Sequence, residues 1–439
     1  MLNLPTKCYF LNILSHFYPL FFNTTYRMAA FAAVSFAEGI TFGGWLRCLA
    51  APVASNGEDT ITAAGNSWGA VPRSARLNFT AVAPDGNAGF SSGIKNPADM
   101  TLESGDEANL WVKPLDIVKV SYGKYDNNTL RGDLCYGSWN WMRPNNAWYV
   151  GDEGLLMSGN GDTGLMAEVT PMDGLYIQAL VPITEKNIKA GDTYKKLRAG
   201  FAYTVPGLVK VKGQYIGRGK GSVKVGDTIY AEMKDVDVTD PNTFEIKDNG
   251  TIKPKNKTAT ADADGNSNCT LEAEVDVLAV EGLFAGVGFQ YNVVKDGNKS
   301  ANAEDQMKIA LGVSYQVMPE LKVSASGAFL TYYKKNDVKE DSRFQAGVGV
   351  DYDLGDGLAA NADFRYKSKA GVDGTKTKYS DNMSFSVGVV KSVSSNGKIG
   401  VAFQGTTNSG SLATIAGLPH DGENKNFVWA IPVAIEVSF

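Results

Sequence analysis

Histidine, cysteine and long apolar runs are scarce in this sequence. Its 439 residues include 2 histidines and 4 cysteines. Because His16 lies in a segment that resembles a targeting signal, a Ser-His-Asp or Cys-His catalytic arrangement would depend on His420 alone. No Cys-x-x-Cys pair occurs, which removes a spacing typical of zinc and redox sites. We therefore predict that the protein is not an enzyme and holds no metal or other cofactor.

A basic excess is also missing. The formal net charge is −5 and the sequence pI is about 5.3, so the charge pattern of a nucleic-acid-binding protein is absent. Beyond residue 37 no apolar run reaches the ~18 residues that a transmembrane helix needs. No Pro-rich or Ser-rich linker divides the chain, so we expect residues 38–439 to form one domain.

What the sequence has in abundance is strict alternation of apolar and polar side chains. In the last segment, 426–439, one face carries only large apolar residues: Phe427, Trp429, Ile431, Val433, Ile435, Val437 and Phe439. Residues 343–354 and 358–367 alternate in the same way. Period two over ten residues or more indicates a β-strand and excludes an amphipathic helix. A tilted membrane-spanning strand needs roughly 9–11 residues, whereas strands of globular sheets are usually shorter.

Short and long connections alternate along the whole chain. Tight turns are expected at 84–86, 114, 171–174, 206–207, 281–282, 318–320, 355–357 and 395–397. Longer polar stretches separate these hairpins at 95–106, 126–162, 183–196, 218–268, 295–304, 335–342, 371–380 and 408–425. Eight hairpins, a first strand at 39–47 and a last one at 426–439 give about eighteen strands, an even number as in bacterial barrels. Sixteen is the alternative count, because the N-terminal half is less regular.

The terminal Phe439 on an apolar stripe resembles the C-terminal signal of bacterial outer-membrane β-barrels, where assembly machinery reads the last aromatic residue. The sorted loops resemble their short periplasmic turns and long external loops. The resemblance implies an all-β fold, a single antiparallel transmembrane β-barrel in the bacterial outer membrane. It implies contact with outer-membrane lipid and with the barrel assembly machinery, and leaves a homo-oligomer, for example a trimer, open.

The first residues are predicted to be a targeting segment rather than part of the fold. Lys7 and Arg27 are basic, apolar residues lie between them, and Ser35-Phe36-Ala37 has the small-x-small form of a cleavage site. We expect residues 1–37 to be a signal peptide for export across the inner membrane. A short N-terminal plug is the alternative.

Three cysteines remain after residue 37, namely Cys48, Cys135 and Cys269. The loop pattern places all three toward the external side, where disulfides are permitted. A disulfide between Cys48 and Cys135 is one hypothesis; three free thiols without a role are the other.

The loop at 126–162 combines aromatic residues with charges of both signs. Its position and length resemble those of the third loop of general bacterial porins, which folds into the barrel and narrows the channel. The resemblance implies a pore constriction formed by Arg131, Asp133, Trp139, Trp141, Arg143, Trp148, Asp152 and Glu153. The alternative is an external loop whose tryptophans pack at the barrel rim.

Alternation also assigns charged residues to the lumen, because a charged side chain facing lipid costs about 2–4 kcal/mol at mid-bilayer for Arg or Lys. The candidate lumen-facing residues are Arg198, Lys210, Lys212, Glu272, Glu274, Lys308, Asp351, Asp363, Arg365 and Lys367. Both signs occur, so no ion preference is predicted.

Three classes of function fit such a barrel. The leading one is a porin-like channel for passive diffusion of small hydrophilic solutes and ions. The second is a surface adhesin or antigen whose external loops, especially 218–268, bind host molecules. An outer-membrane enzyme or a gated lipid transporter is the third. The scarcity of histidine disfavours the enzyme, and a first strand that begins near residue 38 leaves no room for a transporter plug.

Overall fold

A computed structural model gives the fold of the chain. It describes residues 40–65, 75–96, 103–126, 129–132, 155–159, 161–184, 189–223, 225–226, 228–231, 233–260, 263–294, 299–300, 305–333, 342–368, 370–371, 378–379, 381–407 and 427–439. The predicted targeting segment 1–37 lies outside the described residues, as do most residues of the 126–162 loop.

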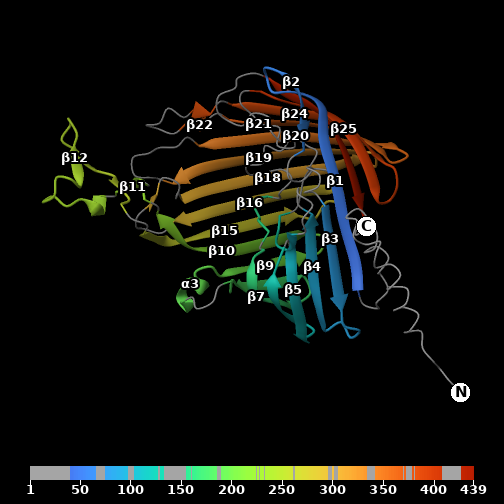
Figure 1. Ribbon diagram of the computed structural model, residues 1–439, viewed down its shortest axis with the longest axis horizontal. Coiled ribbons are helices and arrows are strands. Elements are labelled where there is room, and N and C mark those ends of the chain that lie inside the picture. Colours follow the sequence, from blue (N-terminus) through green and yellow to red (C-terminus); the bar gives the residue numbers. More distant parts are fainter. Residues whose placement is uncertain are drawn as a thin grey trace, which may run out of the picture.

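Eighteen antiparallel strands close into one barrel (Figure 1). In ring order they are β1 (Ile40–Ser55), β3 (Ala75–Val82), β4 (Ala88–Asn96), β5 (Glu103–Leu115), β6 (Val118–Lys124), β7 (Thr163–Met172), β8 (Leu175–Val181), β9 (Arg198–Val205), β10 (Val209–Val223), β15 (Ala263–Val277), β16 (Leu283–Val294), β18 (Asp305–Met318), β19 (Leu321–Tyr333), β20 (Arg343–Gly355), β21 (Leu358–Lys367), β24 (Asn382–Ser392), β25 (Gly397–Thr406) and β26 (Val428–Ser438). The predicted fold class and the count of eighteen are confirmed, and sixteen is excluded.

The barrel closes between its first and last strands. Residues Trp45–Ser55 of β1 pair with Trp429–Ser438 of β26, and the Arg47 Nε donates a 2.5 Å hydrogen bond to Glu436 across this seam. The backbone of Gly44 exchanges hydrogen bonds of 2.7 and 3.0 Å with the terminal Phe439. Closure removes the unpaired strand edges that lipid cannot satisfy.

The two ends of the barrel differ. Short turns join the strand pairs at one end, here called the turn end, which also holds the start of β1 and the end of β26. The turn between β20 and β21 shows why these residues make tight hairpins. Gly355, Asp356 and Gly357 all have positive φ, at 83°, 51° and 73°. Glycine adopts this region freely and aspartate tolerates it, as two-residue hairpin turns require.

Long connections lie at the other end, the loop end. A lobe of residues 225–260 projects from it and contains β11 (Thr228–Tyr230), η3 (Met233–Asp235), β12 (Phe244–Ile246), β13 (Ile252–Pro254) and β14 (Lys257–Thr258) (Figure 1). The remaining elements of the loops are β2 (Thr60–Ala64), α3 (Ala190–Tyr194), β17 (Lys299–Ser300), β22 (Ala370–Gly371) and β23 (Lys378–Tyr379).

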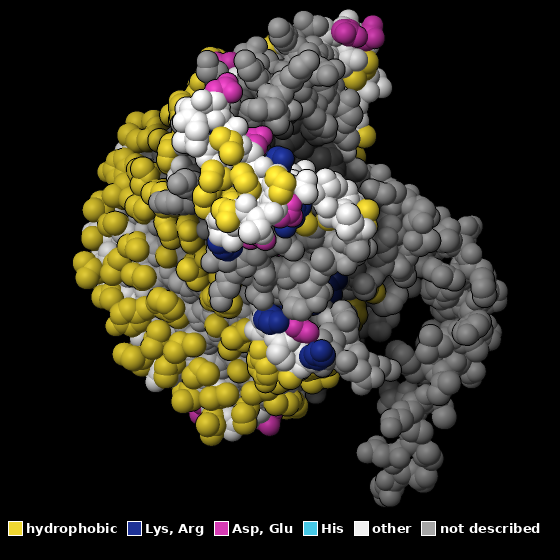
Figure 2. Space-filling model, turned by 90° about the vertical axis from the view of Figure 1, so that its left-hand side faces the viewer, with side chains coloured by type: hydrophobic (Ala, Val, Ile, Leu, Met, Phe, Trp, Pro, Cys, Tyr) yellow, Lys and Arg dark blue, Asp and Glu magenta, His cyan; other side chains and the backbone are white. Residues whose placement is uncertain are grey.

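The outer face of the strands is apolar. Along β20 exposed Phe344, Ala346, Val348 and Val350 alternate with buried Arg343, Gln345, Gly347 and Gly349. Figure 2, which looks onto the loop end, shows hydrophobic side chains covering the curved flank of the barrel. A surface this apolar would be unstable in water, whereas a barrel in a bilayer needs it.

Several predicted boundaries were wrong, and for one reason. The first strand was expected to end at residue 47, but β1 runs to Ser55 because its second half pairs with β2 on one edge and with β26 on the other. Likewise β10 and β15 extend into the predicted loop 218–268. Beyond the apolar belt a strand no longer needs an alternating pattern, so the sequence does not reveal how far pairing continues.

The cysteine hypothesis changes with these boundaries. Cys48 lies within β1, opposite Ile435 of β26, rather than in a loop. The thiols of Cys48 and Cys269 are free. The predicted disulfide between Cys48 and Cys135 is therefore wrong; Cys135 itself lies outside the described residues.

Candidate functional site

Oppositely charged side chains pair across β10 and β15 on the inner face of the barrel. The ladder between these strands places Lys210 opposite Asp276 and Lys212 opposite Glu274. The Lys212 Nζ lies 3.0 Å from the Glu274 Oε1 and 4.0 Å from the Asp276 Oδ2, and the Lys212 side chain is fully buried. Buried charges need partners of this kind, because their desolvation otherwise outweighs their attraction.

The loop between β6 and β7 folds onto this wall. The Lys212 Nζ donates a 2.9 Å hydrogen bond to the carbonyl oxygen of Arg131, near the start of the loop. Near its end, the Ser158 backbone N–H and its Oγ each donate a 2.8 Å hydrogen bond to the Glu272 carboxylate. The Gln214 Nε2 donates to the carbonyl oxygen of Ser158, at 2.8 Å. Inward-facing side chains of β10 and β15 therefore bind both ends of the loop.

Glycines of β16 provide the room for this contact. A Cβ added at Gly288 would lie 1.7 Å from the carbonyl oxygen of Leu155, and one at Gly286 would lie 2.4 Å from its Cδ1. Leu155 and Leu156 are buried there against Ala310 and Ala328 of the neighbouring strands. Both glycines lie in the half of β16 nearer the turn end, so the loop reaches past the middle of the barrel.

The two ends of the loop also contact each other. The Gly132 N–H donates a 3.1 Å hydrogen bond to the carbonyl oxygen of Met157, and the Tyr125 N–H donates one of 2.9 Å to that of Asp162. Leu130 and Met157 are fully buried. Residues 130–132 and 155–157 therefore lie next to each other inside the barrel.

Of the eight residues predicted to form a constriction, the structure describes Arg131, which is half-buried. Asp133, Trp139, Trp141, Arg143, Trp148, Asp152 and Glu153 lie outside the described residues. Their role at a constriction remains a hypothesis. The described ends of the loop contact the inner wall of the barrel.

The remaining predicted lumen residues occupy two regions of the inner wall. Arg198 of β9 donates a 2.6 Å hydrogen bond to Asp162 at the end of the loop. Lys308, Asp351, Asp363, Arg365 and Lys367 lie on β18, β20 and β21, where the Arg365 Nη2 is 3.4 Å from the Asp363 Oδ1. Lys308 lies opposite Gln290, which donates a 2.7 Å hydrogen bond to Glu272, so it adjoins the β10–β15 contact. Asp351, Asp363, Arg365 and Lys367 form a separate polar surface further around the barrel.

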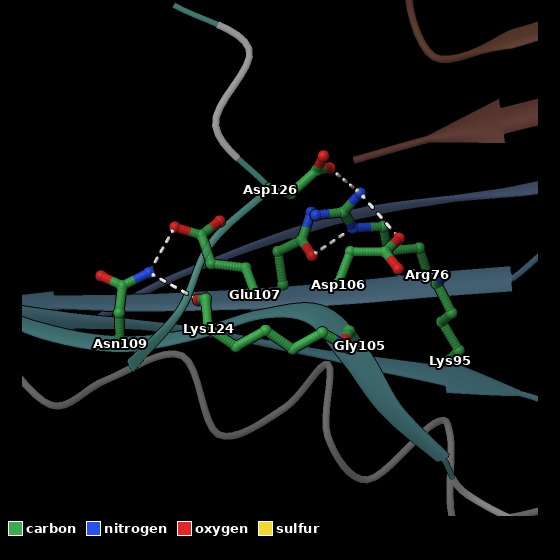
Figure 3. A network of polar contacts seen from close by, with 9 residues as sticks. Arg76, Lys95, Gly105, Asp106, Glu107, Asn109, Lys124 and Asp126 are labelled. Atoms are coloured by element: carbon green, nitrogen blue, oxygen red, sulfur yellow. Dashed lines mark hydrogen bonds and ion pairs between the residues drawn. The ribbon is translucent and has the colours of Figure 1, made fainter. Parts of the chain in front are cut away.

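A third polar surface was missed from the sequence (Figure 3). Arg76 of β3 forms an ion pair with Asp126, at 3.1 Å, and lies 3.7 Å from Asp106 of β5, which also pairs with Lys95 of β4. Alternation does not reveal it, because a β-bulge between Ser92 and Ile94 shifts the register of β4 against β5. Pairing changes from Ser92 opposite Ala108 to Ile94 opposite Ser104, so residues 105–107 of β5, which include Asp106, lie opposite Gly93 alone.

A cavity of about 200 Å³ adjoins this surface. It is lined by Glu107, Asn109, Lys119, Tyr125, Asp126, Thr129, Met166 and Glu168. The Lys119 Nζ lies 2.8 Å from the Glu168 carboxylate. Burial, and then the charge of Glu168, raise the pKa of the Tyr125 hydroxyl, so Tyr125 stays neutral and donates to the carbonyl oxygen of Gly164, at 3.2 Å.

In the part of the chain that the structure describes, no group of three or more His, Cys, Asp or Glu residues is arranged to hold a metal ion. The same residues include no helix long and apolar enough to cross a membrane.

No family model and no curated protein matches the chain. Among solved structures, the anion-selective porin from Comamonas acidovorans has a TM-score of 0.48 and 11% identity, covering 91% of this chain and 99% of its own. Outer-membrane OmpT of Vibrio cholerae has a TM-score of 0.44 and 12% identity over 91% and 97%. The outer membrane channel DcaP of Acinetobacter baumannii has 0.44 and 11% over 91% and 97%.

These identities and TM-scores are low, so the barrel's own geometry carries the assignment. It combines a closed ring of eighteen strands, an apolar outer face and a polar inner face. Such a closed barrel leaves no backbone group unpaired toward lipid. The structure is a closed antiparallel β-barrel whose apolar outer face and polar inner face suit a membrane-spanning position.

Proposed function

We propose that the protein is a passive channel through which small hydrophilic solutes and ions diffuse across the outer membrane. A barrel of sixteen to eighteen strands is too wide for its strand side chains to fill, so it encloses an aqueous lumen. Diffusion through such a lumen needs no catalytic group and no cofactor.

The observation that carries this proposal is the contact of both ends of the 126–162 loop with the inner wall of the barrel. The buried Lys212, Glu272 and Gln214 bind its two ends, and Gly286 and Gly288 make space for Leu155. A loop that served only surface recognition would gain nothing from a seat past the middle of the barrel. We propose that this loop forms the narrowest part of the channel, with the eight residues named from the sequence at its constriction.

The test is planar-bilayer recording with refolded protein. We expect stepwise current increases as single barrels insert, with ohmic behaviour at low voltage. Heat-denatured protein at the same concentration and in the same detergent is the control. Absence of current steps from protein that still shows a heat-modifiable band on gels would refute the channel.

A surface adhesin is the second candidate, favoured by the lobe at residues 225–260. Val225, Val238 and Ile246 expose 63%, 73% and 67% of their surface there, and the lobe projects away from the barrel (Figure 1). Removing residues 233–256 should then abolish binding of the purified protein to host cells while leaving conductance unchanged. Equal cell binding by the truncated and full-length proteins would exclude the lobe as an adhesin.

Assembly and oligomeric state belong to the same proposal. Phe439 is 61% exposed at the turn end, where a periplasmic factor could reach it, and we propose that the barrel assembly machinery recognises it. We also propose export by the 1–37 segment and association into a homo-oligomer such as a trimer. Cross-linking in outer-membrane fractions tests the last point.

A further inference from the structure

The inner wall of the barrel is unevenly covered. From β10 round to β25 the following inner-facing polar side chains are each less than one-tenth exposed: Lys212, Gln214, Thr270, Glu272, Glu274, Asp276, Gln290, Ser314, Ser324, Arg343, Gln345, Asp363, Arg365, Lys367, Asn382, Ser384, Ser386, Gln404 and Thr406. Charged side chains of β4, β5 and β6 are more open: Lys95, Asp106 and Lys119 keep 38%, 39% and 34% of their side-chain surface. Lys95, Asp106 and Lys119 are therefore more open to water than the buried charges Lys212, Glu272, Glu274 and Asp276 of β10 and β15.

The docked loop explains part of this asymmetry. Leu155, Leu156 and Ser158 lie directly over β15 and β16, so an ion on that side of the lumen meets the loop instead of the buried carboxylates. A cavity of about 200 Å³ lies against the β5–β7 wall.

Charged pairs form two levels along this wall. Arg76 and Asp126 lie near the loop end, joined at 3.1 Å (Figure 3). Lys119 and Glu168 lie nearer the turn end, joined at 2.8 Å. The cavity connects the two levels, because Asp126, Lys119 and Glu168 all line it.

We propose that ions and small polar solutes cross the barrel along the β5–β7 wall, and that the carboxylate of Glu107 there favours cations over anions. Three carboxylates and one ammonium group line the cavity. Arg76 compensates Asp126, and Lys119 compensates Glu168, which leaves the charge of Glu107, whose Oε1 accepts a 3.0 Å hydrogen bond from neutral Asn109. Charged side chains lining a pore set its ion preference. This proposal rests on the channel function proposed above.

The test compares two substitutions that each remove one positive charge. Lys119→Gln acts on the open wall, and Arg343→Gln, at an 8% exposed position of β20, acts on the covered wall. The measured quantity is the ratio of K⁺ to Cl⁻ permeability, from the reversal potential in a KCl gradient across a planar bilayer. We expect Lys119→Gln to raise the ratio about tenfold, because the Boltzmann factor of about three for two unit charges about 6 Å apart in water favours K⁺ and disfavours Cl⁻ alike. Arg343→Gln should leave it unchanged.

Glu107→Gln removes a negative charge instead, and it should lower the ratio of K⁺ to Cl⁻ permeability by about the same factor. It also keeps the Lys119–Glu168 ion pair, so it carries the test if Lys119→Gln does not assemble. Equal shifts for Lys119→Gln and Arg343→Gln, or no shift for Glu107→Gln, would overturn the proposed path. A wild-type protein without any conductance would instead refute the channel function itself.

Discussion

Replacing Gly288 by alanine tests directly whether the 126–162 loop packs against the inner wall at β16. The new Cβ would lie 1.7 Å from the carbonyl oxygen of Leu155, and contacts below 3.0 Å are essentially never observed, so the loop must retreat by at least 1.3 Å. The wall cannot move, since β16 is paired on both edges. The displacement is therefore directed into the lumen.

This displacement also breaks polar contacts. Ser158 follows Leu155 by three residues, and its two 2.8 Å hydrogen bonds to Glu272 would stretch past hydrogen-bonding length. Each such bond to a charged group contributes about 1.5–3 kcal/mol, so losing both should weaken the attachment of the loop to the wall by about 3–6 kcal/mol. The barrel wall itself keeps all its backbone pairing.

We expect Gly288→Ala to lower single-channel conductance and to raise open-channel current noise, because a loosened loop then occupies the lumen. Gly327→Ala is the matched control, because the nearest atom to its added Cβ is 3.7 Å away. Both are measured in planar bilayers at equal salt, with heat-modifiability on gels as the check of assembly. Wild-type conductance and noise in Gly288→Ala would refute the inward seat of the loop.

Three further changes test other parts of the molecule. Deleting residues 136–150 should raise single-channel conductance and relax size selectivity in liposome-swelling assays; unchanged conductance would place that segment at the rim. Lys212→Met removes the buried ammonium group that pairs with Glu274, which should cost about 3–5 kcal/mol and lower the urea midpoint of unfolding, whereas half-exposed Lys398→Met should not. Phe439→Asp should reduce the heat-modifiable barrel in outer-membrane fractions far more than Phe427→Asp does, and equal assembly of the two would show that the terminal position has no special role.

The sequence by itself determined the fold class and the two faces of the sheet, and it limited the number of strands to about eighteen, with sixteen as the alternative. Lipid on one side and water on the other impose a strict period of two on each strand, as in residues 343–354, and this period is local. Turn residues such as Gly355-Asp356-Gly357 are equally local, because positive φ depends on the residue that adopts it. These features could be read without knowing which strands meet.

Only the tertiary structure decided where the functional surfaces lie. The extension of β1 to Ser55 depends on its pairing with β2 and β26, and the network of Arg76 with Asp106 and Asp126 depends on a bulge that alternation does not signal. The seat of Leu155 on Gly286 and Gly288 joins residues more than a hundred positions apart. Such contacts depend on how the ring closes and on which wall the loop binds, and no local pattern in the sequence encodes either.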